Sequence, residues 1–194
     1  ITPFIRYYHT PWIGEYVTGL VVTLIGWVCA VGIYFFLRSG RYLPSIGFFS
    51  TALDVTLVST ALLTFVIVGP PHAGANSRVT FPIYFLAIAA TSLRYDRRIC
   101  ITTGVLAVVQ YIAVVFYDGQ RWGFNNPRYA PFEYGPVTMA DQFNRVVLLI
   151  AATILAYEVV RRAEILRRAA VKDLLTDLPN RSYVEGRAAG EFSR

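Results

Sequence analysis

Five long apolar stretches, separated by short polar segments, constrain the fold of this 194-residue chain more than any other feature. The stretches cover residues 13–37, 48–68, 79–93, 99–117 and 139–160. A helix needs about 20 apolar residues to cross the hydrocarbon core of a bilayer, and each stretch is near that length. The third is the shortest, and Pro82 near its start is tolerated because the first turn of a helix needs no N–H there. The sequence therefore predicts an all-α membrane protein, a polytopic helical bundle with five transmembrane helices.

Composition and charge also favour a lipid environment. Hydrophobic residues make up 55% of the chain, the mean hydropathy is +0.48, and only 15% of the residues are charged. The net charge of +6 comes mostly from Arg residues at the ends of the apolar stretches. A nucleic-acid binder would gather such charge on one polar face. We therefore expect the lipid bilayer, and no nucleic acid, as a partner.

The distribution of Arg and Lys predicts an orientation. The segments 38–41, 94–98 and 161–172 are richer in these residues than the alternate loops, so the positive-inside rule places them in the cytoplasm. The C-terminal tail is then cytoplasmic, and residues 1–12 lie outside the inner membrane of the cell. A chain that starts outside implies one more helix upstream, so we expect six helices in a longer parent protein.

Two polar side chains lie within the apolar stretches. Asp54 follows about two turns after the start of the second stretch, where a carboxylate costs about 2.5–3.5 kcal/mol to insert. We expect it to face the bundle interior, near the hydroxyl groups of Thr51, Thr56 and Ser59. It is either a ligand- or proton-sensing group or one end of a helix–helix hydrogen bond. Gln110 must also face inward, because its amide cannot stay unsatisfied in lipid.

A polar cluster lies near the expected outer membrane face. Asp141 and Arg145 are four residues apart and can pair on one helix face; in the alternative interpretation, Arg145 clamps an acidic ligand. With Gln110 and Asn144 they lie under the aromatic loop 118–138, which is either an interfacial belt or a lid. We predict that a ligand pocket, if the bundle has one, lies here and takes an apolar or amphipathic small molecule. A purely structural bundle is the alternative.

The cysteines and histidines do not predict a metal site, a haem site or a disulfide. Cys29 and Cys100 lie away from the oxidising side of the membrane. His9 and His72 fall in expected outer loops without a third ligand nearby, and no His lies inside an apolar stretch. We therefore expect no metal and no cofactor in this chain.

The fifth apolar stretch continues into a polar segment without a helix breaker. No Gly or Pro interrupts residues 159–177, so we expect one helix to continue to about residue 176. Small and apolar residues recur along it at alternating intervals of four and three, which is a heptad pattern. These residues are Ala152, Ala156, Val159, Ala163, Leu166 and Ala170. The pattern predicts a parallel homodimer through the last transmembrane helix and a cytoplasmic signalling helix. A solvated helix whose Arg residues contact anionic lipid is the alternative.

A short motif near the C-terminal end resembles a known family. Residues 173–181 read D-L-L-T-D-L-P-N-R. This segment resembles the D-x-L-T-x-L-x-N-R signature that opens GGDEF domains, the diguanylate cyclase family, with Asp177 where Gly is usual. The matching residues are Asp173, Leu175, Thr176, Leu178, Asn180 and Arg181. The resemblance covers about the last twenty residues.

The resemblance implies the activity of a longer parent enzyme. Such an enzyme joins two GTP molecules into cyclic di-GMP, one from each subunit of a dimer, with Mg²⁺ at the cyclase domain. This chain contains no G-G-D/E-E-F turn, so no catalytic residue is expected in it. By the resemblance, Asp173, Thr176, Asn180 and Arg181 belong to a hinge that couples the signalling helix to the catalytic domain.

The sequence therefore divides into a multi-pass sensor domain (1–160), a signalling helix (161–172) and the start of an incomplete GGDEF domain (173–194). We expect the membrane signal-input region of a diguanylate cyclase. One alternative is the input region of a GGDEF-EAL protein, either a cyclic di-GMP phosphodiesterase or a regulatory protein. Another is a transporter-like or other non-enzymatic membrane protein, although the sequence shows neither internal repeats nor broken helices. A histidine kinase would need a His in residues 157–194, which contain none.

Overall fold

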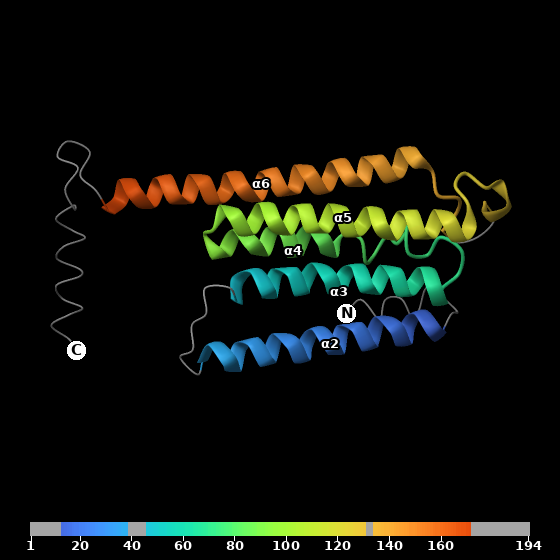
Figure 1. Ribbon diagram of the computed structural model, residues 1–194, viewed down its shortest axis with the longest axis horizontal. Helices are drawn as coiled ribbons and strands as arrows, with labels where there is room; N and C mark the ends of the chain where they lie inside the picture. Colours follow the sequence, from blue (N-terminus) through green and yellow to red (C-terminus); the bar gives the residue numbers. More distant parts are fainter. Residues whose placement is uncertain (1–12, 39–45, 131–133, 172–194) are drawn as a thin grey trace.

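The computed structural model describes residues 13–38, 46–130 and 134–171, and every regular element in these ranges is a helix (Figure 1). The α-helices are α2 (Ile13–Arg38), α3 (Ile46–Val68), α4 (Ile83–Thr91), α5 (Arg97–Trp122) and α6 (Met139–Val171). Two short 3₁₀ turns, η1 (Ser92–Arg94) and η2 (Pro127–Tyr129), complete the set. The predicted all-α class is confirmed for the described part of the chain.

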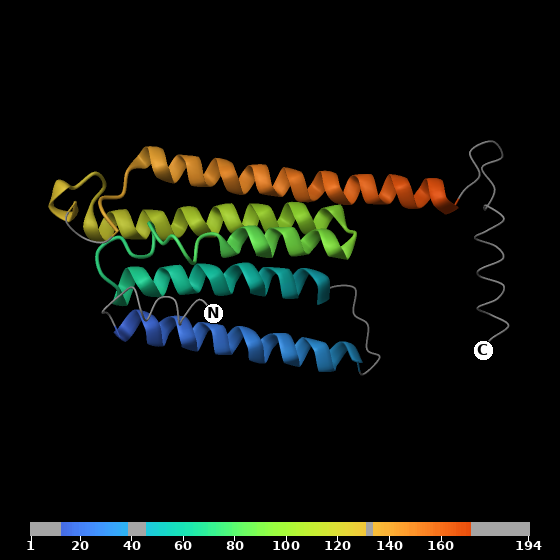
Figure 2. The same ribbon diagram turned by 180° about the vertical axis from the view of Figure 1, so that it is seen from behind.

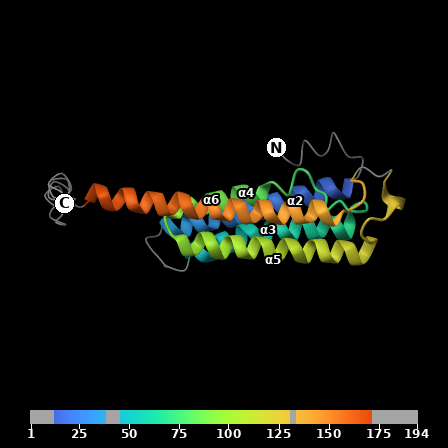
Figure 3. The same ribbon diagram turned by 90° about the horizontal axis from the view of Figure 1, so that it is seen from above.

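The five α-helices run side by side along the long axis of the molecule (Figure 1, Figure 2). α5 packs against both α3 and α6, α4 contacts all three of these helices, and α2 packs against α3. Buried apolar side chains of α3, α4, α5 and α6 form one continuous core. No described side chain of α2 is buried in this core. α6 extends beyond the end of α5, as the view from above shows (Figure 3).

Three helical segments are long and apolar enough to cross a membrane: Ile46–Val68, Arg97–Trp122 and Met139–Arg167. The other two expected spans appear in the described residues as the shorter apolar helices Gly19–Phe35 and Ile83–Arg94. The chain thus has the helices of a membrane protein. Within the described residues, three of the five spans expected from the sequence meet the length and composition that crossing a bilayer requires.

The expected third span, 79–93, is not a full helix. α4 has only 9 residues and begins directly after Pro82. Before it, residues 69–82 form a series of turns that are largely buried, and we call this segment the plug. Its backbone is satisfied locally, for example by Ala73 N–H donating to Pro70 O at 3.1 Å and by Asn76 N–H donating to His72 O at 2.9 Å. A broken helix, which the sequence analysis did not find, is therefore present here.

The breaks have a direct physical cause. Pro70 and Pro71 follow the last turn of α3, and proline supplies no N–H and clashes with the preceding turn of a helix. Gly74 then allows a close contact, because a Cβ at this position would lie 2.2 Å from Val66 Cγ2. The plug consequently folds back against α3 instead of continuing away from it, and it runs between the ends of α3 and α5 toward α4 (Figure 2).

α5 is longer than the stretch 99–117 from which it was predicted. Asp96 caps its first turn by accepting a hydrogen bond from Arg98 N–H at 2.8 Å, and the helix ends at Gly123, whose φ is 82°. Glycine favours this left-handed end. Asp118, which we had assigned to the outer loop, therefore lies in the last part of the helix and is fully buried.

α5 and α6 approach each other closely at one glycine. A Cβ at Gly104 would lie 2.1 Å from Thr153 Oγ1 and 2.2 Å from Thr153 Cγ2, so no larger residue fits without movement. Small residues at helix crossings allow such close packing between membrane helices. Farther along, Arg97 on α5 and Glu164 on α6 form an ion pair at 3.1 Å. Together these contacts fix α6 alongside α5.

α6 continues past the apolar stretch without interruption to Val171, as predicted for the described residues. The predicted heptad residues, however, do not share one environment. Ala156 is buried against the rest of the bundle, whereas Val159 and Leu166 are 48% and 70% exposed. Ala152 and Ala156 therefore pack within the chain, and the exposed face of α6 carries other apolar residues. Residues 173–194 lie outside the described residues.

Candidate functional site

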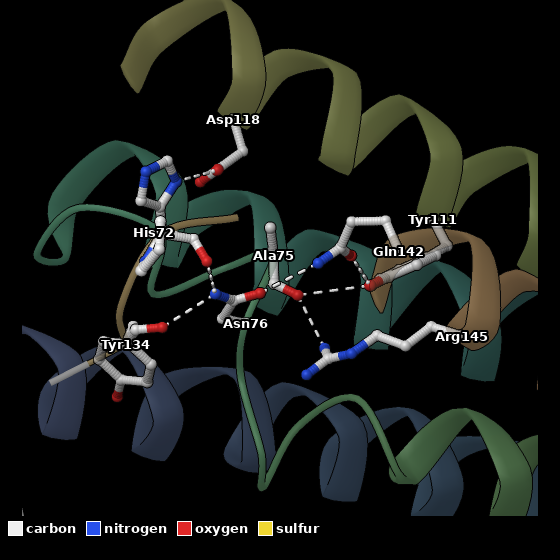
Figure 4. Close-up of polar contacts among 9 residues, drawn as sticks. His72, Ala75, Asn76, Tyr111, Asp118, Tyr134, Gln142 and Arg145 are labelled. Atoms are coloured by element: carbon white, nitrogen blue, oxygen red, sulfur yellow. Dashed lines mark hydrogen bonds and ion pairs between the residues drawn. The ribbon is translucent and has the colours of Figure 1, made fainter. Parts of the chain in front are cut away.

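The plug is attached to α5 by a buried pair. His72 Nδ1 lies 2.6 Å from Asp118 Oδ2, and both side chains are fully buried (Figure 4). The ring nitrogen and the carboxylate oxygen therefore share one hydrogen bond, in which the role of each atom depends on the tautomer of the ring. His72 also has a φ of 64°, in the left-handed region that non-glycine residues rarely adopt. Such strain is typical of segments that the surrounding contacts hold in place.

This pair leaves polar atoms unused in the described residues. His72 Nε2, Asp118 Oδ1 and Trp122 Nε1 are buried and have no hydrogen-bond partner there. The ring of Tyr129, in η2, packs edge-on against His72 at 5.1 Å and against Trp122 at 5.9 Å. Buried polar atoms are normally satisfied by an ordered water or a ligand. His72 and Trp122 both lie against the Tyr129 ring, and their ring nitrogens, which have no partner in the described part of the chain, are the groups that a small polar ligand would satisfy.

A second set of contacts attaches the plug to α5, to α6 and to the segment that joins these two helices (Figure 4). Asn76 Nδ2 donates to the backbone oxygens of Tyr134 at 2.8 Å and Pro136 at 3.2 Å. Gln142 Nε2, on α6, donates to Asn76 Oδ1 at 3.0 Å, and Tyr111 OH, on α5, donates to Gln142 Oε1. Asn76 and Gln142 thus have their side-chain groups engaged within the protein.

Arg145 binds the plug through its backbone. Its Nη1 donates to Ala75 O at 2.7 Å and to Ser77 O at 3.4 Å, and its guanidinium lies 4.7 Å from the centre of the Phe81 ring. Hydrogen bonds from a charged donor are stronger than neutral ones. Arg145 therefore holds a segment of the same chain through backbone oxygens, whereas our two interpretations expected Asp141 or an acidic ligand as its partner.

The predicted Asp141–Arg145 pair is wrong, because each residue has a different partner. Asp141 belongs to a helix cap: Thr138 Oγ1 donates to Asp141 Oδ2 at 2.6 Å, and Asp141 N–H donates to Thr138 Oγ1 at 3.1 Å. This reciprocal arrangement satisfies backbone groups at the start of α6. Asn144 is exposed and lies on a different face of α6 from the buried Gln142.

Gln110 lies apart from the plug contacts, in a network that joins α3, α4 and α5. Its Oε1 accepts a hydrogen bond from Ser59 Oγ, and its Nε2 donates to Thr56 Oγ1 at 3.1 Å. Ser59 Oγ also lies 2.7 Å from Tyr84 OH. The amide is thus satisfied between helices, as its position in an apolar stretch required.

Asp54 does not face the bundle interior as expected. It lies on the exposed side of α3 and lines a cavity between α2 and α3. The hydroxyl groups that we expected beside it bond elsewhere, because Thr51 Oγ1 donates to Gly47 O at 3.1 Å and Thr56 and Ser59 contact Gln110. The structure therefore separates the predicted site residues: Arg145 holds the plug, Gln110 lies between helices, and Asp54 lines a cavity.

The sequence analysis missed His72, Asn76, Asp118 and Gln142 as a group. A signal was present for one of them: Asp118 directly follows an apolar stretch, so one more helical turn would have placed it in the bundle. His72 lies 46 residues from Asp118, and no local pattern connects the two positions. The hinge residues Asp173, Thr176, Asn180 and Arg181 lie outside the described residues.

Comparison with known proteins gives no relative. No protein-family profile, no curated protein and no solved structure matches this chain. In the described residues, no group of three or more His, Cys, Asp or Glu side chains is placed to hold a metal ion. The candidate site therefore rests on its own geometry, which is a strained, buried segment held by two helices and beneath an aromatic loop.

Proposed function

We propose that this chain is the membrane signal-input region of a diguanylate cyclase that makes cyclic di-GMP from two GTP molecules with Mg²⁺. The resemblance of residues 173–181 to the opening of GGDEF domains supports the enzyme class. The apolar helices support an input region within the membrane, with the cytoplasmic side at the C-terminal end of α6. In this proposal the plug is the element that responds to a signal.

One observation carries the proposal: a single helix contacts the plug and leads to the motif. α6 has 33 residues, which corresponds to about 50 Å at a rise of 1.5 Å per residue. Gln142 and Arg145 in its first two turns bind the plug, and its last residue, Val171, is two positions before Asp173. A helix without a break transmits displacement along its length better than a loop does.

The proposed mechanism uses two arrangements of the plug. In the one described here, His72 binds Asp118 while the backbone around Ala75 binds Arg145. A signal that replaces either contact, such as a small polar molecule at the unused atoms of His72 and Asp118, would favour another arrangement. Arg145 is hydrogen-bonded to carbonyl groups of the plug, so a movement of the plug would displace Arg145 and with it α6. The displacement of α6 would then reach the proposed hinge. This hinge consists of Asp173, Thr176, Asn180 and Arg181.

Dimerisation is part of this proposal, because each cyclase subunit supplies one GTP. The outer face of α6 offers Leu155, Val159 and Leu166, which are 66%, 48% and 70% exposed. Their spacing of four and seven residues fits a heptad seam. We expect single cysteines at Val159 and Leu166 to form disulfides between two copies in membranes, whereas a cysteine at the buried Ala156 should not. Equal cross-linking at all three positions would reject this seam.

The test of function uses the full-length protein in lipid nanodiscs with GTP and Mg²⁺. We expect synthesis of cyclic di-GMP, and we expect Gln142→Leu and Arg145→Met to change its rate by at least about threefold while the exposed control Phe143→Leu leaves it unchanged. Hydrolysis of added cyclic di-GMP without synthesis would assign the phosphodiesterase alternative. If the protein neither synthesises nor hydrolyses cyclic di-GMP, the proposed enzyme class is rejected. If the rate of synthesis is the same in wild type, Gln142→Leu and Arg145→Met, the proposed route through the plug is rejected.

A further inference from the structure

A cavity of about 330 Å³ lies between α2, α3 and the junction of the plug with α4. This volume is within the range of small-molecule sites, which is about 300–1,000 Å³. α2 contributes Gly19, Thr23 and Gly26 to the wall, and a Cβ at Gly19 would meet nothing within 4 Å. The glycines therefore leave room that ordinary side chains on α2 would occupy.

The wall carries one ionisable group, Asp54. Among the described residues, its carboxylate forms no hydrogen bond and no ion pair within 4 Å. The positive charge of Arg94 acts on the Asp54 carboxylate from a distance, but the hydrogen bond of Arg94 Nη1 goes to Gly47 O. The hydroxyl of Thr23 is also engaged, since it donates to Gly19 O at 2.7 Å. A carboxylate between apolar helices without a close partner is unfavourable.

The wall that α3 contributes to the cavity has its charged residue at one end and apolar residues along the rest. Asp54 and Phe65 both line it and are eleven residues apart on α3, which separates them by about 16 Å along the helix. The α3 residues between them that line the cavity, Leu57, Val58 and Ala61, are all apolar. A ligand that complements this wall has one cationic group beside Asp54, where it pairs with the carboxylate. Its hydrocarbon part is directed toward Phe65.

We propose that this cavity binds an amphipathic primary amine, with its ammonium group against the Asp54 carboxylate and its alkyl chain along α3. An ammonium group supplies three donors and the opposite charge, whereas a neutral alcohol supplies one donor and no charge, and an anionic amphiphile is repelled by the carboxylate. At about 30 Å³ per non-hydrogen atom, the space of a liquid water, the cavity holds roughly eleven such atoms. This site is separate from the plug contacts of His72 and Arg145, and its binding does not depend on the cyclase proposal.

The probe that we choose is n-octylammonium, which has nine non-hydrogen atoms, with 1-octanol and octanoate as neutral and anionic controls. Binding to the full-length protein in lipid nanodiscs is measured by saturation-transfer NMR and by the shift in thermal unfolding. Partition of the probe into lipid is the same for every variant, so differences between variants report the site. Asp54→Asn keeps the shape of the side chain and should weaken octylammonium binding by at least about tenfold.

A second pair of variants tests the cavity without changing its charge. Gly19→Leu places a side chain into the open space and should also abolish binding, whereas Gly32→Leu, on the same helix but outside the cavity wall, should not. Both substitutions favour helix formation, so neither is expected to unfold α2. Equal affinity of wild type and Asp54→Asn for octylammonium would overturn the proposal. So would equal binding of 1-octanol and octylammonium by the wild type, which would show a hydrocarbon site only.

Discussion

The two sides of the bundle are packed in different ways. Along the contact between α5 and α6 the packing is tight: a Cβ at Gly104 would overlap Thr153, and Leu149 and Val160 are fully buried. Where α2 meets α3, described side chains such as Trp27 are largely exposed, and a cavity separates the helices. The first side is fixed by hydrogen bonds with defined geometry, and the second by apolar contacts that tolerate change.

This difference indicates a division of roles. Polar contacts that cross between elements specify one arrangement, because removing any one of them leaves its partner unsatisfied. Apolar contacts along α2 have no such preference for a single position. We therefore expect substitutions on the α5–α6 side to reduce stability strongly, and equivalent substitutions on the α2 side to have little effect. Four predictions test this contrast, in order of decreasing effect.

The largest effect is expected for Asp118→Ala. It removes one member of the buried pair and leaves His72 without its partner, so the free energy of unfolding should fall by about 3–5 kcal/mol. Thermal and denaturant unfolding in detergent micelles measures the loss. Glu158→Ala, which breaks an exposed ion pair with Arg161, serves as control and should lower stability by less than about 1 kcal/mol. Equal losses for the two variants would contradict the role of the buried pair.

Gly104→Ala should have the next largest effect. The added methyl would overlap Thr153, so α5 and α6 must separate, and overpacking of this kind costs about 1–3 kcal/mol. The same unfolding measurement applies. Thr153→Ala in the same chain removes two of the three overlapping atoms and should restore part of the stability. If the double variant is no more stable than Gly104→Ala alone, the clash is not the cause.

Thr138→Ala should reduce stability by about 1 kcal/mol, because it removes the hydroxyl that caps α6 and binds Asp141. Circular dichroism during unfolding reports the change in midpoint. Thr138→Ser keeps the oxygen atom and should remain close to wild type. A Ser variant as unstable as the Ala variant would show that the methyl group, and not the cap, is responsible.

The smallest effect is expected on the α2 side, from Gly26→Ala. The new Cβ would lie 3.7 Å from Leu57 Cδ1, which is an ordinary contact, and alanine favours a helix by about 0.5–1 kcal/mol over glycine. Stability should therefore stay equal or rise slightly, in contrast to the same substitution at Gly104. A loss of more than about 1 kcal/mol would show that α2 is packed as tightly as α6 and would remove the contrast.

The sequence allowed the helices to be predicted because their signal is local. Each apolar stretch is continuous, and α6 continues past residue 160 since no breaker interrupts it. The third stretch failed for a local reason that was underestimated. Pro82 lies within this stretch, and the helix α4 begins only at Ile83, directly after it.

The candidate site was not predictable in the same way. Asp118 lies in a helix that extends one turn beyond its apolar stretch, and its burial depends on His72 from another segment. Arg145 was expected to pair with Asp141 or to bind an acidic ligand, but its acceptors are backbone oxygens of Ala75 and Ser77, which any sequence would supply. Partners of this kind follow from the path of the chain, and the residue types at those positions do not encode them.

In the proposed mechanism, α6 acts as a lever about the tight contact between Gly104 and Thr153, and this motion requires the Arg97–Glu164 ion pair beyond that contact to open. Arg145 lies eight residues before this contact and Val171 lies eighteen residues after it, which corresponds to arms of about 12 Å and about 27 Å. A stiff rod that pivots at Thr153 therefore moves at its far end about twice as far as at Arg145, and in the opposite direction. A displacement of about 1 Å in the plug thus arrives at Val171 as about 2 Å, reversed in sign.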